Sequence, residues 1–258
     1  MSDSVLRALV ALPFGLVLGS FMTVVIARMP AKESVVAPRS RCPQCKADIR
    51  NRDNIPVLSW LLLRGKCHNC GRKISVEYPL TEAVTAGLFA GAAIVYPSVW
   101  VAILVGLLVA MMPAVALIDF RHRIIPNRLT YPSLIFFPLF VVLAWLFDAP
   151  LSPLGALEGL GLYGGGLFIL ALISRGMGMG DVKLAGVIGV CLGAIGLRYV
   201  GVAAGAGILF GGLMGVVALM LGRDRKSAIP FGPSIAAGVV VAVFWGDRLA
   251  ETYLKLYH

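Results

Sequence analysis

The sequence predicts an all-α polytopic membrane protein, with about eight transmembrane helices and a small cytoplasmic zinc-binding domain between the first two helices. Three observations support this fold class. Hydrophobic residues make up 59% of the 258 residues and charged residues only 14%, against about 25% charged in soluble proteins. The mean hydropathy is +0.87. Long apolar stretches recur along the chain, and the one long polar block between them carries two pairs of cysteines.

Each predicted helix is an apolar stretch of roughly the length that a bilayer requires, about 17–25 residues. The stretches cover approximately residues 5–27, 79–96, 99–118, 131–147, 155–173, 182–196, 199–221 and 229–246. The sixth is the shortest. Glycines recur in the fifth and seventh, where they predict close packing between helices. The chain therefore divides into a first transmembrane helix (1–30), a polar domain (31–78) and a transmembrane domain (79–258).

The distribution of basic residues predicts the orientation, because Lys and Arg accumulate in short cytoplasmic loops. Residues 28–78, 120–130, 174–183 and 222–228 hold 19 of the 23 Lys and Arg residues. We therefore place these segments in the cytoplasm and both termini on the other side of the membrane. The formal net charge of +10 follows from this bias, so it indicates membrane topology and no nucleic-acid partner.

The polar domain contains Cys42-Pro-Gln-Cys45 and Cys67-His-Asn-Cys70, two Cys-x-x-Cys pairs separated by 21 residues. Each pair presents two thiolates from one tight turn, and together they complete the four-sulfur shell of a structural zinc ion. Disulfides are the alternative, but a cytoplasmic loop is kept reduced. A block this small has little core, so zinc is expected to supply much of its folding free energy.

Two aspartates are expected at the cytoplasmic ends of helices. Asp119 ends the third predicted helix, and Asp181 begins the sixth directly after Gly178 and Gly180. An acid beside such an apolar segment is a functional candidate, and the glycines permit close approach by another segment. The two carboxylates should lie at the same depth and face, unless Asp119 forms a salt bridge with the arginines beside it. Glu82 is expected either to pair with a loop arginine or to line a polar cavity.

Two carboxylates in a site of low dielectric share one proton, because both cannot ionise cheaply. One can then activate a water molecule for attack on a peptide carbonyl while the other donates a hydrogen bond to the carbonyl oxygen, as in aspartic proteases. Intramembrane acids also serve as proton or cation sites. An ion-coupled transporter is therefore a second hypothesis, and a zinc-bearing membrane scaffold for secretion is a third.

These motifs, in this order, resemble one family. Gly178-x-Gly180-Asp181, followed by Lys183, resembles the Gly-x-Gly-Asp signature of intramembrane aspartyl proteases. The whole chain resembles the bacterial type IV prepilin peptidases, also called prepilin leader peptidase/N-methyltransferases. The other matching segments are Gly19-Ser-Phe21, both cysteine pairs, Tyr78-Pro-Leu80 with Glu82, Ile125-Pro126 after Asp119, and Pro230-Phe-Gly-Pro233.

The resemblance implies an enzyme of the bacterial inner membrane whose residues 79–258 form a transmembrane aspartyl protease domain. Such enzymes cleave the basic leader of prepilins or pseudopilins after a glycine at the cytoplasmic face, and then N-methylate the new terminus with S-adenosylmethionine. It assigns no residue to the methyl donor. Carried over by motif, the dyad is Asp119 and Asp181, supported by Gly178, Gly180 and Lys183, and the structural zinc ligands are Cys42, Cys45, Cys67 and Cys70.

The chain departs from the family pattern at Thr23, where asparagine is usual. A hydroxyl replaces only part of the donor and acceptor set of an amide. A leader peptidase without methyltransferase activity is therefore an alternative to the dual enzyme.

Overall fold

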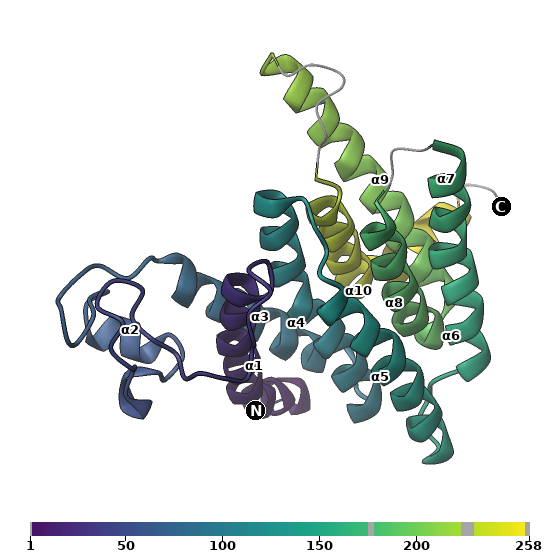
Figure 1. Cartoon of the computed structure of the whole chain (residues 1–258). Helices are drawn as coiled ribbons and strands as arrows, with labels where there is room; N and C mark the ends of the chain where they lie inside the picture. The colour runs from purple at the N-terminus through teal and green to yellow at the C-terminus, as the bar shows by residue number, and fades with distance from the viewer. Residues whose placement is uncertain (1, 175–177, 223–229, 256–258) are drawn as a thin grey trace.

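The computed structural model is a bundle of long helices with one irregular lobe at its side (Figure 1), and it describes residues 2–174, 178–222 and 230–255. The elements are α1 (Asp3–Arg28), η1 (Asn51–Asp53), α2 (Leu58–Leu62), α3 (Glu77–Val95), α4 (Val99–His122), α5 (Asn127–Leu146), α6 (Pro153–Gly159), the π-helical η2 (Leu160–Gly165), α7 (Gly166–Ser174), α8 (Met179–Ile195), α9 (Leu197–Met220) and α10 (Gly232–Lys255).

Among the described residues, seven helices are long and apolar enough to cross a membrane, counting α6, η2 and α7 as one. The remaining predicted span, the sixth (182–196), is α8, which has only 17 residues. The predicted polytopic, all-helical fold is therefore confirmed. The last helix, α10, begins close to the predicted residue but extends further, to Lys255.

The centre of the bundle is formed by α4 and α8. In α4, 72% of the most apolar stretch is buried, whereas in α9 the share is 11%. Twelve of the 17 residues of α8 are buried, including Leu184, Ile188 and Leu192. By contrast, Figure 1 shows the far end of α9 reaching beyond the other helices. The core therefore surrounds the two helices that carry Asp119 and Asp181.

Glycines let α8 pack against α6 backbone to backbone, as the sequence predicts. A Cβ atom on Gly159 would overlap the carbonyl oxygen of Gly189, and one on Gly189 would overlap the carbonyl oxygen of Gly159. The same close approach repeats one turn along at Gly155 and Gly193. Other glycines of these predicted spans have room for a Cβ atom, with no neighbour within 4 Å of its position, namely Gly161, Gly165, Gly166, Gly201, Gly205 and Gly212.

The segment between α1 and α3, residues 29–76, forms a separate lobe that we call the cysteine lobe. Its regular structure is limited to η1, α2 and two isolated β-bridges, Arg41 with Asp48 and Lys66 with Lys73. Trp60 packs inside the lobe: its Nε1 donates a hydrogen bond to the carbonyl of Ile74 at 3.2 Å. Between residues 30 and 76 the one buried hydrophobic residue is Cys42, so the lobe has almost no apolar core.

Polar contacts join the helix ends at one end of the bundle, which we call the charged end. Arg121 of α4 pairs with Glu77 of α3, and Arg128 of α5 donates to the carbonyl of Lys32 at 2.9 Å. At the opposite end, Tyr199 of α9 donates to Asp247 of α10 at 2.6 Å. The cysteine lobe and both predicted aspartates therefore lie toward the same end.

Candidate active site and cysteine cluster

Asp119 lies in the last turn of α4 and is only 6% exposed. Its Oδ2 accepts a hydrogen bond from the backbone N–H of Gly232 at 2.7 Å. A side chain at position 232 would collide with it, because a Cβ atom there would lie 2.8 Å from both Cβ and Oδ2 of Asp119. The Pro230-Phe-Gly-Pro233 segment thus positions a backbone donor directly on this carboxylate.

Asp181 lies in the first turn of α8, with Gly178 at the N-cap position. A Cβ atom on Gly180 would lie 3.0 Å from the Cβ of Ile125, in the segment that follows α4. Gly180 therefore lets the start of α8 approach the end of α4, as the motif predicts. A methyl group on Gly178 would make only ordinary contact with Asp181, at 3.4 Å. Gly176 and Met177, which precede this motif, lie outside the described residues.

The structure brings the two aspartates together. α4 contacts α8, and the carboxylates of Asp119 and Asp181 interact electrostatically. A third polar group, which the sequence did not indicate, is the buried Tyr163 of η2; it too interacts electrostatically with Asp181. The sequence does not mark Tyr163 as a site residue, because only the folded structure shows that η2 packs on α8.

The basic residues beside the aspartates have other partners. Arg121 pairs with Glu77 and not with Asp119. Among the described residues, the salt bridge considered for Asp119 is therefore not formed. Lys183 Nζ donates to Asn127 Oδ1 at 2.5 Å and lies 4.7 Å from the centre of the Tyr131 ring. Lys183 therefore ties α8 to α5 instead of contacting a carboxylate.

The four predicted cysteines form one cluster. All four sulfur atoms lie within 4.8 Å of one another, and Cys42 and Cys70 are 3.9 Å apart at Sγ. A tetrahedral site with zinc–sulfur distances of about 2.3 Å requires sulfurs about 3.8 Å apart. None of the cysteines is in a disulfide. The cluster therefore fits a metal ion better than cystine bridges.

Backbone N–H groups favour the thiolate form at two of the cysteines, lowering the pKa of Cys45 and of Cys67. The Ala47 N–H, followed by the Asn69 side chain, donates hydrogen bonds that lower the pKa of Cys45 to about 6. Each cysteine pair closes a tight turn whose last residue has positive φ, Lys46 at 59° and Gly71 at 68°. Because a metal binds the thiolate form, Cys45 is ready to bind at neutral pH.

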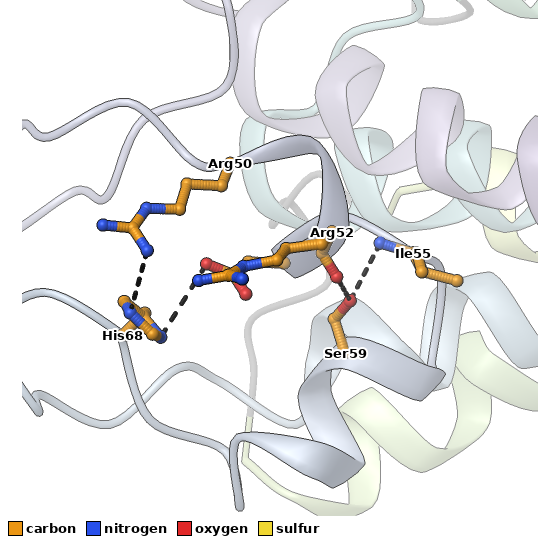
Figure 2. A network of polar contacts seen from close by, with 6 residues as sticks. Arg50, Arg52, Ile55, Ser59 and His68 are labelled. Carbon is orange, nitrogen blue, oxygen red and sulfur yellow. Dashed lines mark hydrogen bonds and ion pairs between the residues drawn. The ribbon is translucent and has the colours of Figure 1, made fainter.

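His68 lies between two of the cysteines but has polar partners outside the cluster (Figure 2). Arg50 Nη1 is 3.3 Å from His68 Nε2, and His68 Nδ1 is 3.9 Å from Asp53 Oδ2. The same figure shows Ser59, whose Oγ accepts from the Ile55 N–H and donates to the Arg52 carbonyl, both at 2.9 Å. These bonds link the second cysteine pair to the start of α2.

Glu82 pairs with a backbone N–H and not with a loop arginine. It is 9% exposed within α3, and its Oε2 accepts a hydrogen bond from the backbone N–H of Val57 at 2.7 Å. Val57 has φ of 61°, a conformation that β-branched residues rarely adopt. Glu82 therefore fastens the cysteine lobe to the bundle, and of the two expectations the loop arginine was wrong, because the partner is a backbone N–H.

The fold and the paired carboxylates define a class: multi-pass membrane proteins that present acids from two helices at one membrane face. Comparison with known proteins gives the family. Residues 106–244 match the Type IV leader peptidase family, and residues 13–96 match the Bacterial Peptidase A24 N-terminal domain. This chain belongs to the type IV leader peptidase family.

Curated relatives match along nearly their whole length. The "Prepilin leader peptidase/N-methyltransferase" of Bacillus subtilis (strain 168) is 38% identical, over 94% of this chain and 96% of the relative. The "Type 4 prepilin-like proteins leader peptide-processing enzyme" of Escherichia coli O78:H11 is 33% identical, over 89% and 91%. The "Prepilin leader peptidase/N-methyltransferase" of Pseudomonas aeruginosa is 33% identical, over 93% and 91%. No solved structure matches.

Proposed function

We propose that this protein cleaves the leader peptides of type IV prepilins or pseudopilins and then N-methylates the new terminus. The observation that carries the proposal is the meeting of Asp119 and Asp181 from separate helices at the charged end. Family membership and the names of the relatives support both activities. They do not favour the ion-coupled transporter or the zinc-bearing scaffold.

In the proposed reaction, Asp119 and Asp181 act as an aspartic dyad. The Gly232 N–H stabilises a negative charge on Asp119, so we assign Asp119 as the carboxylate that takes a proton from the attacking water. Asp181 then holds the shared proton, donates a hydrogen bond to the scissile carbonyl oxygen, and passes a proton toward the leaving amine. The tetrahedral centre collapses as the peptide C–N bond breaks.

The proposed second step acts on the amine that cleavage releases. With S-adenosylmethionine as the donor, the amine nitrogen forms a bond to the methyl carbon, the bond from that carbon to sulfur breaks, and the amine gives up one proton. The chain must therefore hold the new terminus and the donor near each other. This requirement places the donor at the charged end, where the dyad lies.

We assign the charged end to the cytoplasmic face of the inner membrane, since its described segments, 28–78, 120–130 and 178–183, hold 15 of the 23 basic residues. A basic leader and the apolar helix that follows it would meet the dyad there. We assign zinc to Cys42, Cys45, Cys67 and Cys70, because their spacing fits the ion's tetrahedral shell. Its role is structural, because four protein ligands leave no open position for substrate.

The test is cleavage of a prepilin-like peptide, with a basic leader, a Gly-Phe junction and an apolar helix, by the purified enzyme in detergent. Asp119→Asn and Asp181→Asn should each lower the rate by about 10²–10⁴-fold. Asp148→Asn, which changes an exposed acid after α5 in the same way, should leave the rate unchanged. Full activity in both dyad variants would refute the assignment; ion-coupled uptake without cleavage would favour a transporter.

A further inference from the structure

The structure contains a second polar site at the charged end, on the other side of α4 from the dyad. It is a cavity of about 170 Å³ lined by Thr23 and Ile26 of α1, Glu77 and Tyr78 of α3, and Arg121 and His122 of α4. We call it the Glu77–Arg121 cavity, after the ion pair in its wall. The proposed dyad chemistry uses none of these residues.

The cavity lies between the two regions of the chain that match family models. Its α1 and α3 residues belong to the N-terminal region, 13–96, and its α4 residues to the peptidase region, 106–244. Both dyad aspartates lie in the peptidase region alone. Ligand sites occur preferentially at such domain junctions. The N-terminal region therefore contributes a wall to a site that the peptidase reaction does not need.

The cavity is also close enough to serve the same substrate terminus. Asp119 and Arg121 are two residues apart on α4, so their side chains leave the helix on nearly opposite sides. Asp119 contacts Gly232 of α10, whereas Arg121 contacts Glu77 of α3. The two sites are thus separated by roughly one helix diameter, about 10–12 Å. A freed peptide terminus can reach from one to the other by moving around the end of α4.

Size and charge identify the ligand group. The cavity, at about 170 Å³, is smaller than the pockets of about 300–1,000 Å³ that enclose whole drug-sized ligands, so it suits one end of a ligand, of the size of an amino acid. Its wall offers one guanidinium and one carboxylate side by side. An α-amino acid carries the complementary carboxylate and ammonium on adjacent atoms. Arg121 can bind a carboxylate through two hydrogen bonds, and Glu77 can accept from an ammonium.

We propose that the Glu77–Arg121 cavity binds the amino acid end of the methyl donor, with Arg121 on its carboxylate and Glu77 on its ammonium group. The proposal rests on the methyltransferase part of the proposed function. Thr23 is 9% exposed and already donates its hydroxyl proton to the Ser20 carbonyl at 2.7 Å. It therefore offers the ligand only an acceptor, which suits the ammonium side of the donor.

The experiment measures equilibrium binding of three compounds to the purified full-length enzyme: S-adenosylmethionine, S-adenosylhomocysteine and 5′-methylthioadenosine. The first two carry the amino acid end, and the third lacks it. Arg121→Gln and Glu77→Gln should each weaken binding of the first two by about tenfold or more. Binding of methylthioadenosine should not change. Arg198→Gln, which breaks a more exposed ion pair with Asp247 at the opposite end, should alter none of the three.

A double variant separates ligand binding from a merely structural ion pair. Exchanging the charges, Glu77→Arg with Arg121→Glu, restores the pair but reverses the order in which the cavity presents the two charges. We expect donor binding to stay weak in this variant while prepilin cleavage remains within about twofold of the wild type. Cleavage also shows that each variant is folded.

Two outcomes would overturn the proposal. If both single variants bind S-adenosylhomocysteine as the wild type does, or if the charge exchange restores binding fully, the pair is structural and the methyltransferase function still stands. If the wild type cleaves prepilin but binds none of the three compounds and transfers no methyl group, the methyltransferase part of the function fails together with this site.

Discussion

The cysteine lobe and the helix bundle are stabilised by different forces. The bundle buries long side chains of α4 and α8, such as Leu104, Leu108 and Ile188, completely. The lobe buries no apolar side chain besides Cys42 between residues 30 and 76, and its parts are joined by four sulfurs and by hydrogen bonds. In one chain, apolar packing therefore specifies the helix bundle, whereas the cysteine lobe depends on its polar contacts and on the metal that we propose for its four sulfurs.

Metal removal should produce the largest difference in stability between the cysteine lobe and the helix bundle. Structural zinc contributes about 10–16 kcal/mol in small zinc-binding peptides, and the lobe has almost no core to replace it. We expect chelation, or Cys42→Ser, to make residues 31–76 sensitive to protease while the bundle stays folded. Proteolysis followed by mass spectrometry measures this, with Cys191→Ser as the control outside the cluster. A lobe that still resists protease after complete zinc removal would contradict this view.

A methyl group between α6 and α8 should destabilise the helix bundle and leave the cysteine lobe unaffected. Gly189→Ala places a Cβ atom against the Gly159 carbonyl, so the helices must separate, at a cost of about 1–3 kcal/mol. Gly205→Ala in α9, where no neighbour lies within 4 Å, should be neutral or stabilising by up to about 1 kcal/mol. Thermal unfolding in detergent gives the comparison. An equal gain in both variants would mean that only helix propensity acts, because it favours alanine at both positions, and that the close packing at Gly189 contributes nothing.

Breaking the link between the two parts should loosen the lobe locally. Glu82→Ala leaves the Val57 N–H without its acceptor, which costs about 1–3 kcal/mol for a buried donor. Glu82→Gln keeps an acceptor and should cost less. Hydrogen exchange of residues 54–63 should rise in the alanine variant while zinc content stays full. Unchanged exchange would show that other contacts, such as those of Arg128 with Lys32 and Glu33, hold the lobe.

The smallest effect is expected at the end of the bundle away from the lobe. Tyr199→Phe removes the hydrogen bond to Asp247 and keeps the ring that packs on Gly246. We expect a loss of about 1 kcal/mol in unfolding free energy, with normal cleavage and zinc content. A drop in cleavage would show that this end is coupled to the dyad.

The sequence predicted those features that depend on local chemistry. The span positions followed from apolar length, the cysteine cluster from ligand spacing, and the approach of Asp119 to Asp181 from charge-based topology. In the case of Glu82, however, the sequence indicated a buried acid but not its partner, because the Val57 N–H becomes available only in an unusual backbone conformation.

The sequence could not predict contacts between distant segments, because they also depend on the folded structure. Glycines predicted close packing in two spans, yet Gly159 meets Gly189 while Gly205 has no neighbour within 4 Å, and their sequence surroundings do not differ in any way that tells them apart. Tyr163 and the Glu77–Arg121 pair depend on which helices become neighbours. Such pairings are properties of the assembled bundle.

The short length of α8 has a consequence for what the enzyme recognises. Its 17 residues rise about 26 Å, less than the roughly 30 Å of a hydrocarbon layer. Neighbouring helices surround α8, so lipid does not adjust to this shortfall. Asp181 lies in the first turn of α8, and Asp119 stands a turn below the end of the longer α4. If Asp119 and Asp181 are the proposed dyad, we expect a substrate to unwind or sink until its junction reaches that level, so that the enzyme would measure where an apolar helix begins.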